Sequence, residues 1–524
     1  MGDRSWWGWG RTDCALSDDE CVALGTRLPG LSSTPLPIPR IEQLVVPQAR
    51  ITPPAALAPR FSAAPADRVG HTYGKAYRDV VRALHGDLAC APDLVAYPQT
   101  DAEIVDVLDW AASRRVAVIP YGGGSSVVGG VEYRPASGGA DHCGVISLDL
   151  TAMDRVLEVD RVSRAARIQA GARGPVLEDQ LRPHGLTLRF YPQSYEFSTL
   201  GGWLATRAGG HYATLYTHID DLVESMRVVT PVGTGESWRL PASGAGPSPD
   251  RLFLGSEGIL GVITEAWMRL QERPRHKASA TVAFEDMAAA MQAVRAVAQS
   301  GRHPANCRLL DPGEALLSGV ARNGEAMLVV GVESADYPVE GQLAELLTIA
   351  REHGGARCGD GDGADRSAEA WRTSFLRAPY LRDGLARMGA IVETFETACT
   401  WDRALDLYEA VRASVGAAVE EITGSPGIIN CRFTHVYPDG PALYFTVIGV
   451  GRRGQELVMW DDVKVAAMEI LARHHATVTH HHGVGRDHRP GYDRQRPEPF
   501  AMALRAAKAA LDPHGVLNPG VLVD

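Results

Sequence analysis

Three consecutive histidines near the end of the chain, His480, His481 and His482, are the residues whose type most directly suggests catalytic chemistry. The pKa of a free imidazole lies close to neutrality, so such a side chain can take up or release a proton at working pH. If the segment is the end of a strand, successive side chains point to opposite faces, and His481 points away from the other two. The residue types leave three roles open: proton transfer, a histidine-rich surface turn, or a metal site. The histidines that could complete such a metal site are His474, His475 and His488.

A glycine-rich loop after a buried strand is the second feature with chemical meaning. The strand expected at 116–120 runs directly into Tyr121-Gly122-Gly123-Gly124-Ser125-Ser126. Glycines let the backbone turn sharply and approach a ligand closely. Their amide N–H groups, with the two serine hydroxyls, form a concave array of donors that suits a pyrophosphate. The loop matches neither the P-loop nor the Rossmann pattern, and alone it is compatible with a phosphate site or with an ordinary loop.

Two more segments rich in glycine and small residues follow in the same α/β region. One covers Ser198–Gly202 and continues to Thr206–Gly209, and the other covers Gly255–Val262. A single segment of this kind is compatible with a turn. Three of them in one region indicate one long ligand of dinucleotide type.

The length and composition of the chain limit the classes of protein to which it can belong. At 524 residues the chain is too long for one hydrophobic core, so at least two domains are expected. The net charge of −11 argues against nucleic-acid binding, which needs basic side chains to neutralise phosphates. Eight cysteines without a CxxC pair do not make a disulfide scaffold, and no apolar run of about 18 residues is present. We expect a cytoplasmic protein, with peripheral contact to a membrane left open.

The residue composition and the hydrophobic pattern change at three places in the sequence, which predicts four regions. Residues 1–66 form a Pro-rich arm, and 67–272 form an α/β domain that holds the three glycine segments. Residues 273–475 alternate strands with amphipathic helices and are expected to form an inserted α+β cap over the substrate. Residues 476–524, with the histidines, are expected to pack back on the first domain.

The three glycine segments together resemble the FAD-binding domain of the vanillyl-alcohol-oxidase class. That class has PxGGGxS, PxSxEFSTxGG and GSEGxLGxIT patterns, which correspond to Pro120–Ser126, Pro192–Gly202 and Gly255–Thr264. Members with covalent FAD often have a histidine in the glycine loop, where this chain has Ser125 or Ser126, so the resemblance implies noncovalent FAD. The residues it assigns to the cofactor are Pro120, Tyr121, Gly122, Gly123, Gly124, Ser125, Ser126, Gln193, Ser194, Tyr195, Glu196, Phe197, Ser198, Thr199, Thr206, Arg207, Ala208, Gly209, Glu257, Gly258, Ile259, Leu260, Gly261, Val262 and Ile263.

Within that class, nearly the whole chain resembles the alkyldihydroxyacetonephosphate synthase family. The resemblance rests on short motifs spread over the sequence. They are Trp7–Gly10, Asp67–Val69, His71–Gly74, Pro304–Leu309, Tyr380–Asp383, Glu396–Asp402, Ala442–Phe445 and His480–Gly485.

The resemblance also implies roles for individual residues. His481, between His480 and His482, removes a proton from C1 of the substrate, and Tyr444 handles a second proton. Arg382 holds the substrate phosphate in a bidentate grip, and Arg308 lies near the flavin, where a cation stabilises negative charge. From the residue types alone, Tyr444 is equally compatible with a packed aromatic on a buried strand, and Arg382 with a surface ion pair.

The reaction implied is an exchange without net redox. A fatty alcohol replaces the acyl chain of acyl-dihydroxyacetone phosphate through an adduct on flavin N5, as in ether-lipid synthesis. A lipid-like substrate, a homodimer and no bound metal follow by analogy. Two alternatives remain: an FAD-dependent dehydrogenase or oxidase of a 2-hydroxy acid, in which the arginine binds a carboxylate, and a flavin-binding protein without activity.

Overall fold

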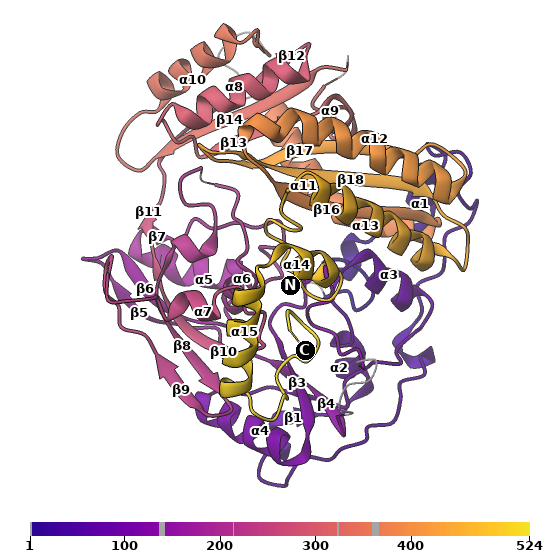
Figure 1. The fold of residues 1–524 in the computed structure, drawn as a ribbon, viewed down its shortest axis with the longest axis vertical. Coiled ribbons are helices and arrows are strands. Elements are labelled where there is room, and N and C mark those ends of the chain that lie inside the picture. The colour runs from indigo at the N-terminus through magenta and orange to yellow at the C-terminus, as the bar shows by residue number, and fades with distance from the viewer. Residues whose placement is uncertain (1–2, 136–141, 213, 322–323, 359–365, 524) are drawn as a thin grey trace.

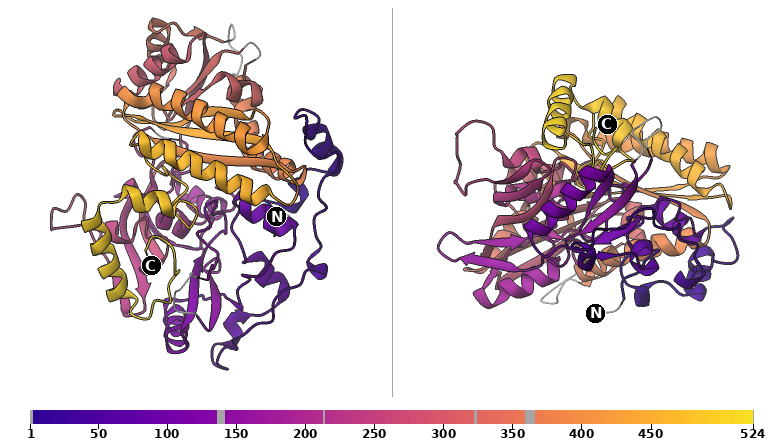
Figure 2. Two further views of the ribbon diagram at one scale, coloured as in Figure 1. Left: turned by 45° about the vertical axis from the view of Figure 1, so that its right-hand side comes forward. Right: turned by 90° about the horizontal axis from the view of Figure 1, so that it is seen from below.

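The computed structural model describes residues 3–135, 142–212, 214–321, 324–358 and 366–523, without the side chains of 366–372. The chain forms two lobes that lie one above the other in Figure 1. The first half of the chain builds the lower lobe, the segment from about residue 276 to 473 builds the upper lobe, and the C-terminal segment returns to the lower lobe. Two turned views show the same division (Figure 2).

The lower lobe has two sheets that share one core. The first has the order β1-β2-β4-β3, in which β2, β4 and β3 are parallel, and the second is antiparallel with the order β5-β6-β10-β8-β9. The strands of the first sheet are β1 (Phe61–Ser62), β2 (Leu94–Ala96), β3 (Val116–Tyr121) and β4 (Gly144–Asp149). Those of the second are β5 (Val156–Asp160), β6 (Ala165–Gln169), β8 (Val223–Thr230), β9 (Gly233–Glu236) and β10 (Val262–Arg269). A short pair joins β7 (Leu186–Thr187) to β11 (Gln271–Glu272).

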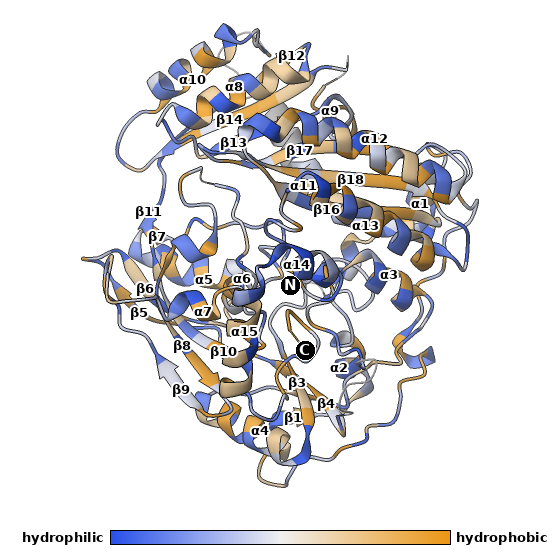
Figure 3. Ribbon diagram, in the orientation of Figure 1, coloured by the Kyte–Doolittle hydropathy of each residue, from blue (hydrophilic) through white to orange (hydrophobic). Residues whose placement is uncertain are grey.

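The helices of the lower lobe begin and end where local chemistry places them. The helix α4 (Asp101–Arg114) begins after Thr100, whose side chain accepts a hydrogen bond from the amide of Glu103. It connects the parallel strands β2 and β3. Figure 3 shows hydrophobic strands in both lobes and helices of mixed polarity. The other helices of this part are α2 (Pro65–Gly70), α3 (Tyr77–Leu84), α5 (Gly174–Leu181), α6 (Leu200–Thr206) and α7 (Asp250–Phe253).

The upper lobe is a seven-stranded antiparallel sheet with helices. Its order is β15-β12-β14-β13-β17-β18-β16, and α12 and α13 lie side by side across one face (Figure 1). Its strands are β12 (His276–Phe284), β13 (Asn306–Leu310), β14 (Ala326–Ser334), β15 (Ala356–Arg357), β16 (Ala390–Ala398), β17 (Ile428–Val436) and β18 (Pro441–Val450). Its helices are α8 (Met287–Gln299), α9 (Pro312–Leu317), α10 (Glu340–Glu352), α11 (Arg366–Arg387), α12 (Ala404–Thr423) and α13 (Glu456–Arg473).

The two faces of this sheet differ in chemistry because side chains alternate along each strand. Leu309, Phe433 and Phe445 belong to the hydrophobic core that the helices cover. Their neighbours Arg432 and Tyr444 project from the opposite face and are paired across β17 and β18. The uncovered face therefore presents buried polar groups toward the lower lobe.

The N-terminal arm is largely extended. Its first part, which contains α1 (Asp18–Gly25), lies on the upper lobe, and the rest continues along the lower lobe, where β1 pairs with β2. The amide of Ser32 donates to the carbonyl of Met388, and the amide of Leu36 donates to the carbonyl of Arg387. The backbone of Trp9 donates to Asp383 at 2.5 Å. The arm is thus attached to the end of α11.

The C-terminal segment completes the lower lobe. After α14 (Arg489–Gln495) and α15 (Glu498–Leu511), Leu517 forms a parallel bridge with Val118 of β3. The buried ammonium of Lys508 donates to Asp512 at 2.5 Å and to the carbonyls of Ile259 and Leu517. One side chain therefore joins α15, the final tail and the third glycine segment.

We predict that Lys508→Met destabilises the protein by about 3–5 kcal/mol, because it leaves the buried carboxylate of Asp512 without its cation. The midpoint of urea unfolding measures the effect. Arg505→Met, which removes an exposed ion pair with Glu498 on the same helix, is the matched control and costs at most about 1 kcal/mol. Equal midpoints for the two variants would contradict this role of Lys508.

Candidate active site

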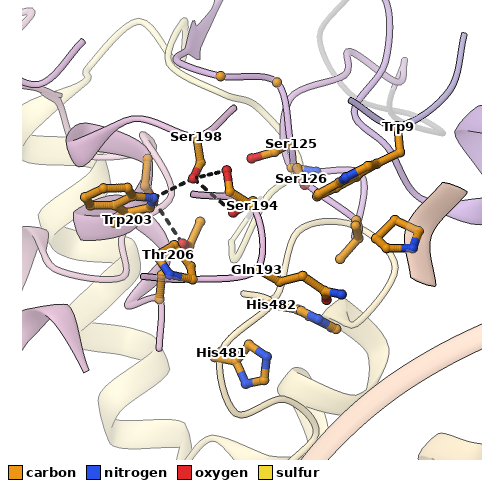
Figure 4. A pocket seen from close by; sticks show the side chains of 18 of the residues that line it. Trp9, Ser125, Ser126, Gln193, Ser194, Ser198, Trp203, Thr206, His481 and His482 are labelled. Carbon is orange, nitrogen blue, oxygen red and sulfur yellow. Dashed lines mark hydrogen bonds between the residues drawn. The ribbon is translucent and has the colours of Figure 1, made fainter. Parts of the chain in front are cut away.

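A cavity between the lobes is lined by residues from all three glycine segments and from the cap. Figure 4 shows residues of the first two segments around it, with Trp9, His481 and His482. The upper lobe contributes α9, α11, β16, β17 and β18, and the C-terminal segment contributes His481 and His482. The predicted cofactor residues that line it are Pro120, Tyr121, Gly122, Gly123, Gly124, Ser125, Ser126, Gln193, Ser194, Ser198, Thr199, Thr206, Ala208, Gly209, Glu257, Gly258, Gly261, Val262 and Ile263.

The other six predicted cofactor residues do not line the cavity. Ile259 and Leu260 belong to a small core with the C-terminal tail. Arg207 pairs with Asp220. The other three do not line the cavity either: Tyr195 packs against Tyr191, Glu196 is exposed, and the ring of Phe197 contacts Trp9. The sequence pattern could not separate them because neighbouring residues of a loop point in different directions.

The glycine loop is fixed by its close approach to the second segment. A Cβ on Gly122 would lie 2.1 Å from the hydroxyl of Thr199, and one on Gly123 would lie 1.8 Å from the carbonyl oxygen of Phe197. Neither position has room for a side chain. No protein acceptor in the described part of the chain receives the amide N–H of Gly122, Gly123, Gly124 or Ser125. Unpaired amides on a cavity wall are what a pyrophosphate requires, so the residues present fit FAD.

Two buried carboxylates hold the histidine segment. Oε1 of Glu396 accepts the amides of His480, His481 and His482 at 3.1, 2.7 and 2.6 Å. Glu257 accepts the amides of Val484 and Gly485 at 2.7 and 2.8 Å. Burial raises the pKa of Glu257 to about 7, although the two amides act in the opposite direction. The path of this loop is therefore set by backbone hydrogen bonds to acids on other elements.

The prediction that His481 points away from its two neighbours is wrong. The segment is a series of bends without strand geometry, so the alternation of strand side chains does not apply. His481 and His482 line the same cavity, as Figure 4 shows, and His480 does not. Burial lowers the pKa of His481 to about 3, so its imidazole is neutral near pH 7.

Tyr444 and Arg382 line the cavity, and Arg308 does not. Tyr444 lies under the guanidinium of Arg432, 3.8 Å from the ring centre, and burial raises the pKa of this tyrosine. Arg308 is buried behind the cavity and donates to Asn306 and to the carbonyl of His211. The neighbouring strand thus supplies Arg432 where the sequence points to Arg308.

Arg382 keeps donors free for an anion. Of its five N–H groups, two bind Asp383 at 2.9 and 2.7 Å and one binds the carbonyl of Lys75 at 2.7 Å. Two remain. Because the partners fix the plane of the guanidinium, the side chain can present the remaining donors to a phosphate or carboxylate in the cavity.

Several residues of the site were missed by the sequence analysis. Trp9, Trp203, Glu314, Thr394 and Arg432 line the cavity. The alternation of Arg432 with Phe433 on a strand was the one available signal, since it places a cation opposite a core residue. Trp9 comes from the N-terminal arm, and no local pattern indicates that this arm reaches the cavity.

Among the residues that the structure describes, two groups of side chains have ligand atoms close enough together to hold a metal ion. They are His435, His480 and His481, and Glu396, His481 and His482. Several of these atoms already make hydrogen bonds: His435 contacts the carbonyl of Gly210, and His480 contacts His481. The absence of a bound metal stays a prediction.

The fold and the cavity define a flavoprotein of the FAD-linked oxidase type. Residues 92–237 match the family described as FAD binding domain, and 273–522 match FAD linked oxidases, C-terminal domain. A solved structure of p-cresol methylhydroxylase has the same fold, with a TM-score of 0.67 at 15% identity over 90% of this chain and 95% of that chain. The predicted fold class and the FAD cofactor are confirmed.

Other proteins are more similar to this chain and narrow the class to one family. Alkyldihydroxyacetonephosphate synthase of Trypanosoma brucei brucei is 32% identical over 482 residues, 87% of this chain and 77% of the relative. That of Dictyostelium discoideum is 31% identical with the same coverage. A solved alkyldihydroxyacetonephosphate synthase superposes with a TM-score of 0.82, at 27% identity over 98% of both chains. The chain belongs to the alkyldihydroxyacetonephosphate synthase family, and the predicted family is confirmed.

We predict that Gly123→Ala abolishes FAD binding, because the new Cβ would overlap the backbone of the second glycine segment. Flavin absorbance of the purified protein measures occupancy. Gly416→Ala on α12 is the control, since a Cβ there meets nothing within 4 Å. Full flavin content in Gly123→Ala would show that the loop does not hold the cofactor.

We also predict that acid destabilises the protein through its buried histidines. Burial lowers the pKa of His488, like that of His481, to about 3, well below the value near 6.5 in an unfolded chain. Between these values the unfolded chain binds more protons, so stability is complete above about pH 6.5 and falls as the pH falls. His488→Gln should reduce the loss of unfolding free energy between pH 7 and 5 by about 2 kcal/mol.

Urea unfolding at the two pH values tests this. The wild-type protein, measured in parallel, gives the reference loss. An unchanged pH dependence in His488→Gln would contradict the assignment.

Proposed function

We propose that this protein replaces the acyl chain of an acyl-dihydroxyacetone phosphate by a long-chain alcohol, with no net oxidation. One observation carries the proposal: a neutral buried imidazole, His481, and an arginine with free donors, Arg382, line one cavity with the cofactor loop. The family of the chain supports the same reaction.

The surroundings of three cavity residues each suit one step of the exchange. Arg382 binds the phosphate with its two free N–H groups and so orients the three-carbon unit. His481 removes the proton from C1, since a neutral imidazole accepts a proton where a charged one cannot. Tyr444 is protonated, and the guanidinium of Arg432 against its ring favours release of that proton to the leaving chain. FAD, when bound, supplies the electrophilic ring that takes part in the exchange.

Besides Arg382, the cavity is lined by many apolar side chains that suit an aliphatic chain. They include Leu24, Leu317, Phe375, Leu381, Leu385, Val392 and Ile448. Because one cavity offers both a guanidinium and a large apolar lining, it can take a phosphate and a chain together. Such a division supports a substrate that is both charged and lipid-like.

Peripheral contact with a membrane is proposed at the cap side of the cavity. Leu316, Leu317 and Leu376 are 61%, 55% and 45% exposed, and Leu317 also lines the cavity. Exposed leucines beside a lipid site offer an apolar contact for a bilayer surface. No helix in the described ranges combines the length and apolar character needed to cross a membrane. The homodimer and the cytoplasmic location stay predictions.

Anaerobic mixing of the holoenzyme with palmitoyl-dihydroxyacetone phosphate tests the function. We expect the flavin absorbance to bleach, fatty acid to be released, and no electron acceptor to be needed. D-lactate and D-2-hydroxyglutarate are the comparison substrates. Bleaching by a hydroxy acid alone, reversed by an electron acceptor, would show a dehydrogenase instead and would reassign Arg382 to a carboxylate.

Substitution of Arg382 tests its contact with the phosphate. Arg382→Met should lower kcat/KM for the ketone phosphate by roughly 10- to 100-fold, the value of a charged hydrogen bond of about 1.5–3 kcal/mol. Arg382→Lys should recover only part of the loss, because it keeps the charge and loses the planar fork. Arg182→Met, at an exposed ion pair with Asp179, is the control. An unchanged kcat/KM in Arg382→Met would remove the residue from the substrate site.

A further inference from the structure

A row of hydrogen-bonded rings leads from His481 away from the cavity. Nδ1 of His481 lies 3.0 Å from Nδ1 of His480. Nε2 of His480 lies 2.8 Å from the hydroxyl of Tyr437 and 3.2 Å from Nε2 of His218. Nδ1 of His218 lies 3.1 Å from the carbonyl oxygen of Arg207. None of these contacts is used by the steps above, and His218 and Tyr437 carry no predicted role.

The carbonyl of Arg207 fixes the direction of the whole row, because a carbonyl oxygen can only accept. Nδ1 of His218 must therefore carry a hydrogen, which makes its Nε2 an acceptor in the neutral ring. Nε2 of His480 then donates, so Nδ1 of His480 accepts from Nδ1 of His481. His481, the last ring of the row, therefore carries its hydrogen on Nδ1. Its Nε2 is unprotonated and has no hydrogen-bond partner among the described residues.

These tautomers require neutral rings, and burial of the rings keeps them neutral. Burial lowers the pKa of His480 well below its usual value, and lowers the pKa of His218 as well. Asp220 and Asp221 act on His218 in the opposite direction. His218 is half-buried, whereas His481 faces the cavity. A positive charge is therefore more easily held at the His218 end of the row.

We propose that His480, His218 and Tyr437 form a proton relay that holds His481 in the tautomer with an unprotonated Nε2 and carries the abstracted proton out of the cavity. The inference rests on the proposed function, in which His481 is the base. His480, His218 and Tyr437 touch no substrate and act as positioning and relay residues.

The proton transfers of the relay balance. His481 takes the C1 proton on Nε2 and passes its Nδ1 proton to Nδ1 of His480. His480 passes its Nε2 proton to Nε2 of His218, which becomes an imidazolium near Asp220. The electron pair of the broken C–H bond stays with the substrate, so no oxidant is required. Reversal of the same transfers returns the proton.

Tyr437 gives the row a second state. Its hydroxyl accepts from Thr217 at 3.0 Å and can donate to Nε2 of His480. This arrangement is the one reached after proton transfer, when His218 is the imidazolium and its Nε2 also donates to Nε2 of His480. His480 then donates through Nδ1 to Nδ1 of His481, and His481 carries its hydrogen on Nε2. The base and the acid forms of His481 thus differ by a reversal of two hydrogen bonds, which suits a residue that removes a proton and later returns it.

Exchange of the C1 hydrogen with solvent measures the relay directly. The wild-type holoenzyme is incubated in D2O with palmitoyl-dihydroxyacetone phosphate, and deuterium at C1 is followed by mass spectrometry. His480→Phe, which cuts the row, should slow exchange by about a hundredfold, the lower end of an acid–base contribution. His218→Ala should also slow exchange, and added imidazole should restore it.

Two further variants separate the relay from packing. His218→Gln can accept from His480 but cannot hold the extra proton, so its rate should lie between those of His218→Ala and the wild type. Tyr437→Phe in the His218→Ala background should match His480→Phe. His353→Gln is the control, because this half-buried histidine also contacts a backbone carbonyl, that of Ile349, outside the row. Flavin absorbance and the thermal midpoint verify that each variant is folded.

The outcomes are distinct. Absence of C1 exchange in the wild type would overturn the proposed function and the relay with it. Wild-type exchange that is unchanged in His480→Phe and in His218→Ala would overturn the relay alone. Loss without rescue by imidazole, or an equal loss in His353→Gln, would show that the rings only support the fold. Loss of exchange in the wild type on removal of metal by EDTA would replace the relay by a metal site.

Discussion

The site depends on one buried carboxylate, that of Glu396. Three successive amides and the hydroxyl of Thr479 converge on Oε1 of this residue. Burial alone would raise its pKa, but the neighbouring histidines offset this, and the pKa lies well below the usual value. A carboxylate so placed determines the path of a loop with no regular structure of its own. The loop in turn gives His481 its place at the cavity and His480 its contacts behind it.

The carboxylate has this effect because it belongs to a strand. Glu396 lies opposite Tyr444 in the pairing of β16 with β18, and Tyr444 lies opposite Arg432 in the pairing of β18 with β17. The same face of one sheet therefore positions the acid, the tyrosine and the cation, while the opposite face is held by the hydrophobic core. A site built on paired strands is more rigid than one built from loops.

How much of this could be predicted depends on the range of the interactions. The glycine segments were predictable, since the need for small residues appears locally, and the cofactor and the fold class followed from them. The family followed from short motifs spread over the chain. The direction of His481 was not, because the bends of its segment come from Glu396, more than eighty residues earlier in the sequence. The position of Trp9 at the cavity has the same kind of origin: its backbone is held by Asp383 on α11, several hundred residues later in the sequence. Such side chains carry no periodic signal.

The parallel bridge between Val118 and Leu517 has a consequence for synthesis of the chain on the ribosome. The strand next to the cofactor loop receives this hydrogen-bonded neighbour only when the segment around Leu517 has been translated, whereas the intervening upper lobe is complete earlier. A nascent chain therefore holds a finished cap on an unfinished lower lobe. Loading of FAD is expected to follow synthesis of this segment, and a chain truncated before Leu517 would retain most of its sequence and lose the bridge to the strand beside the nucleotide loop.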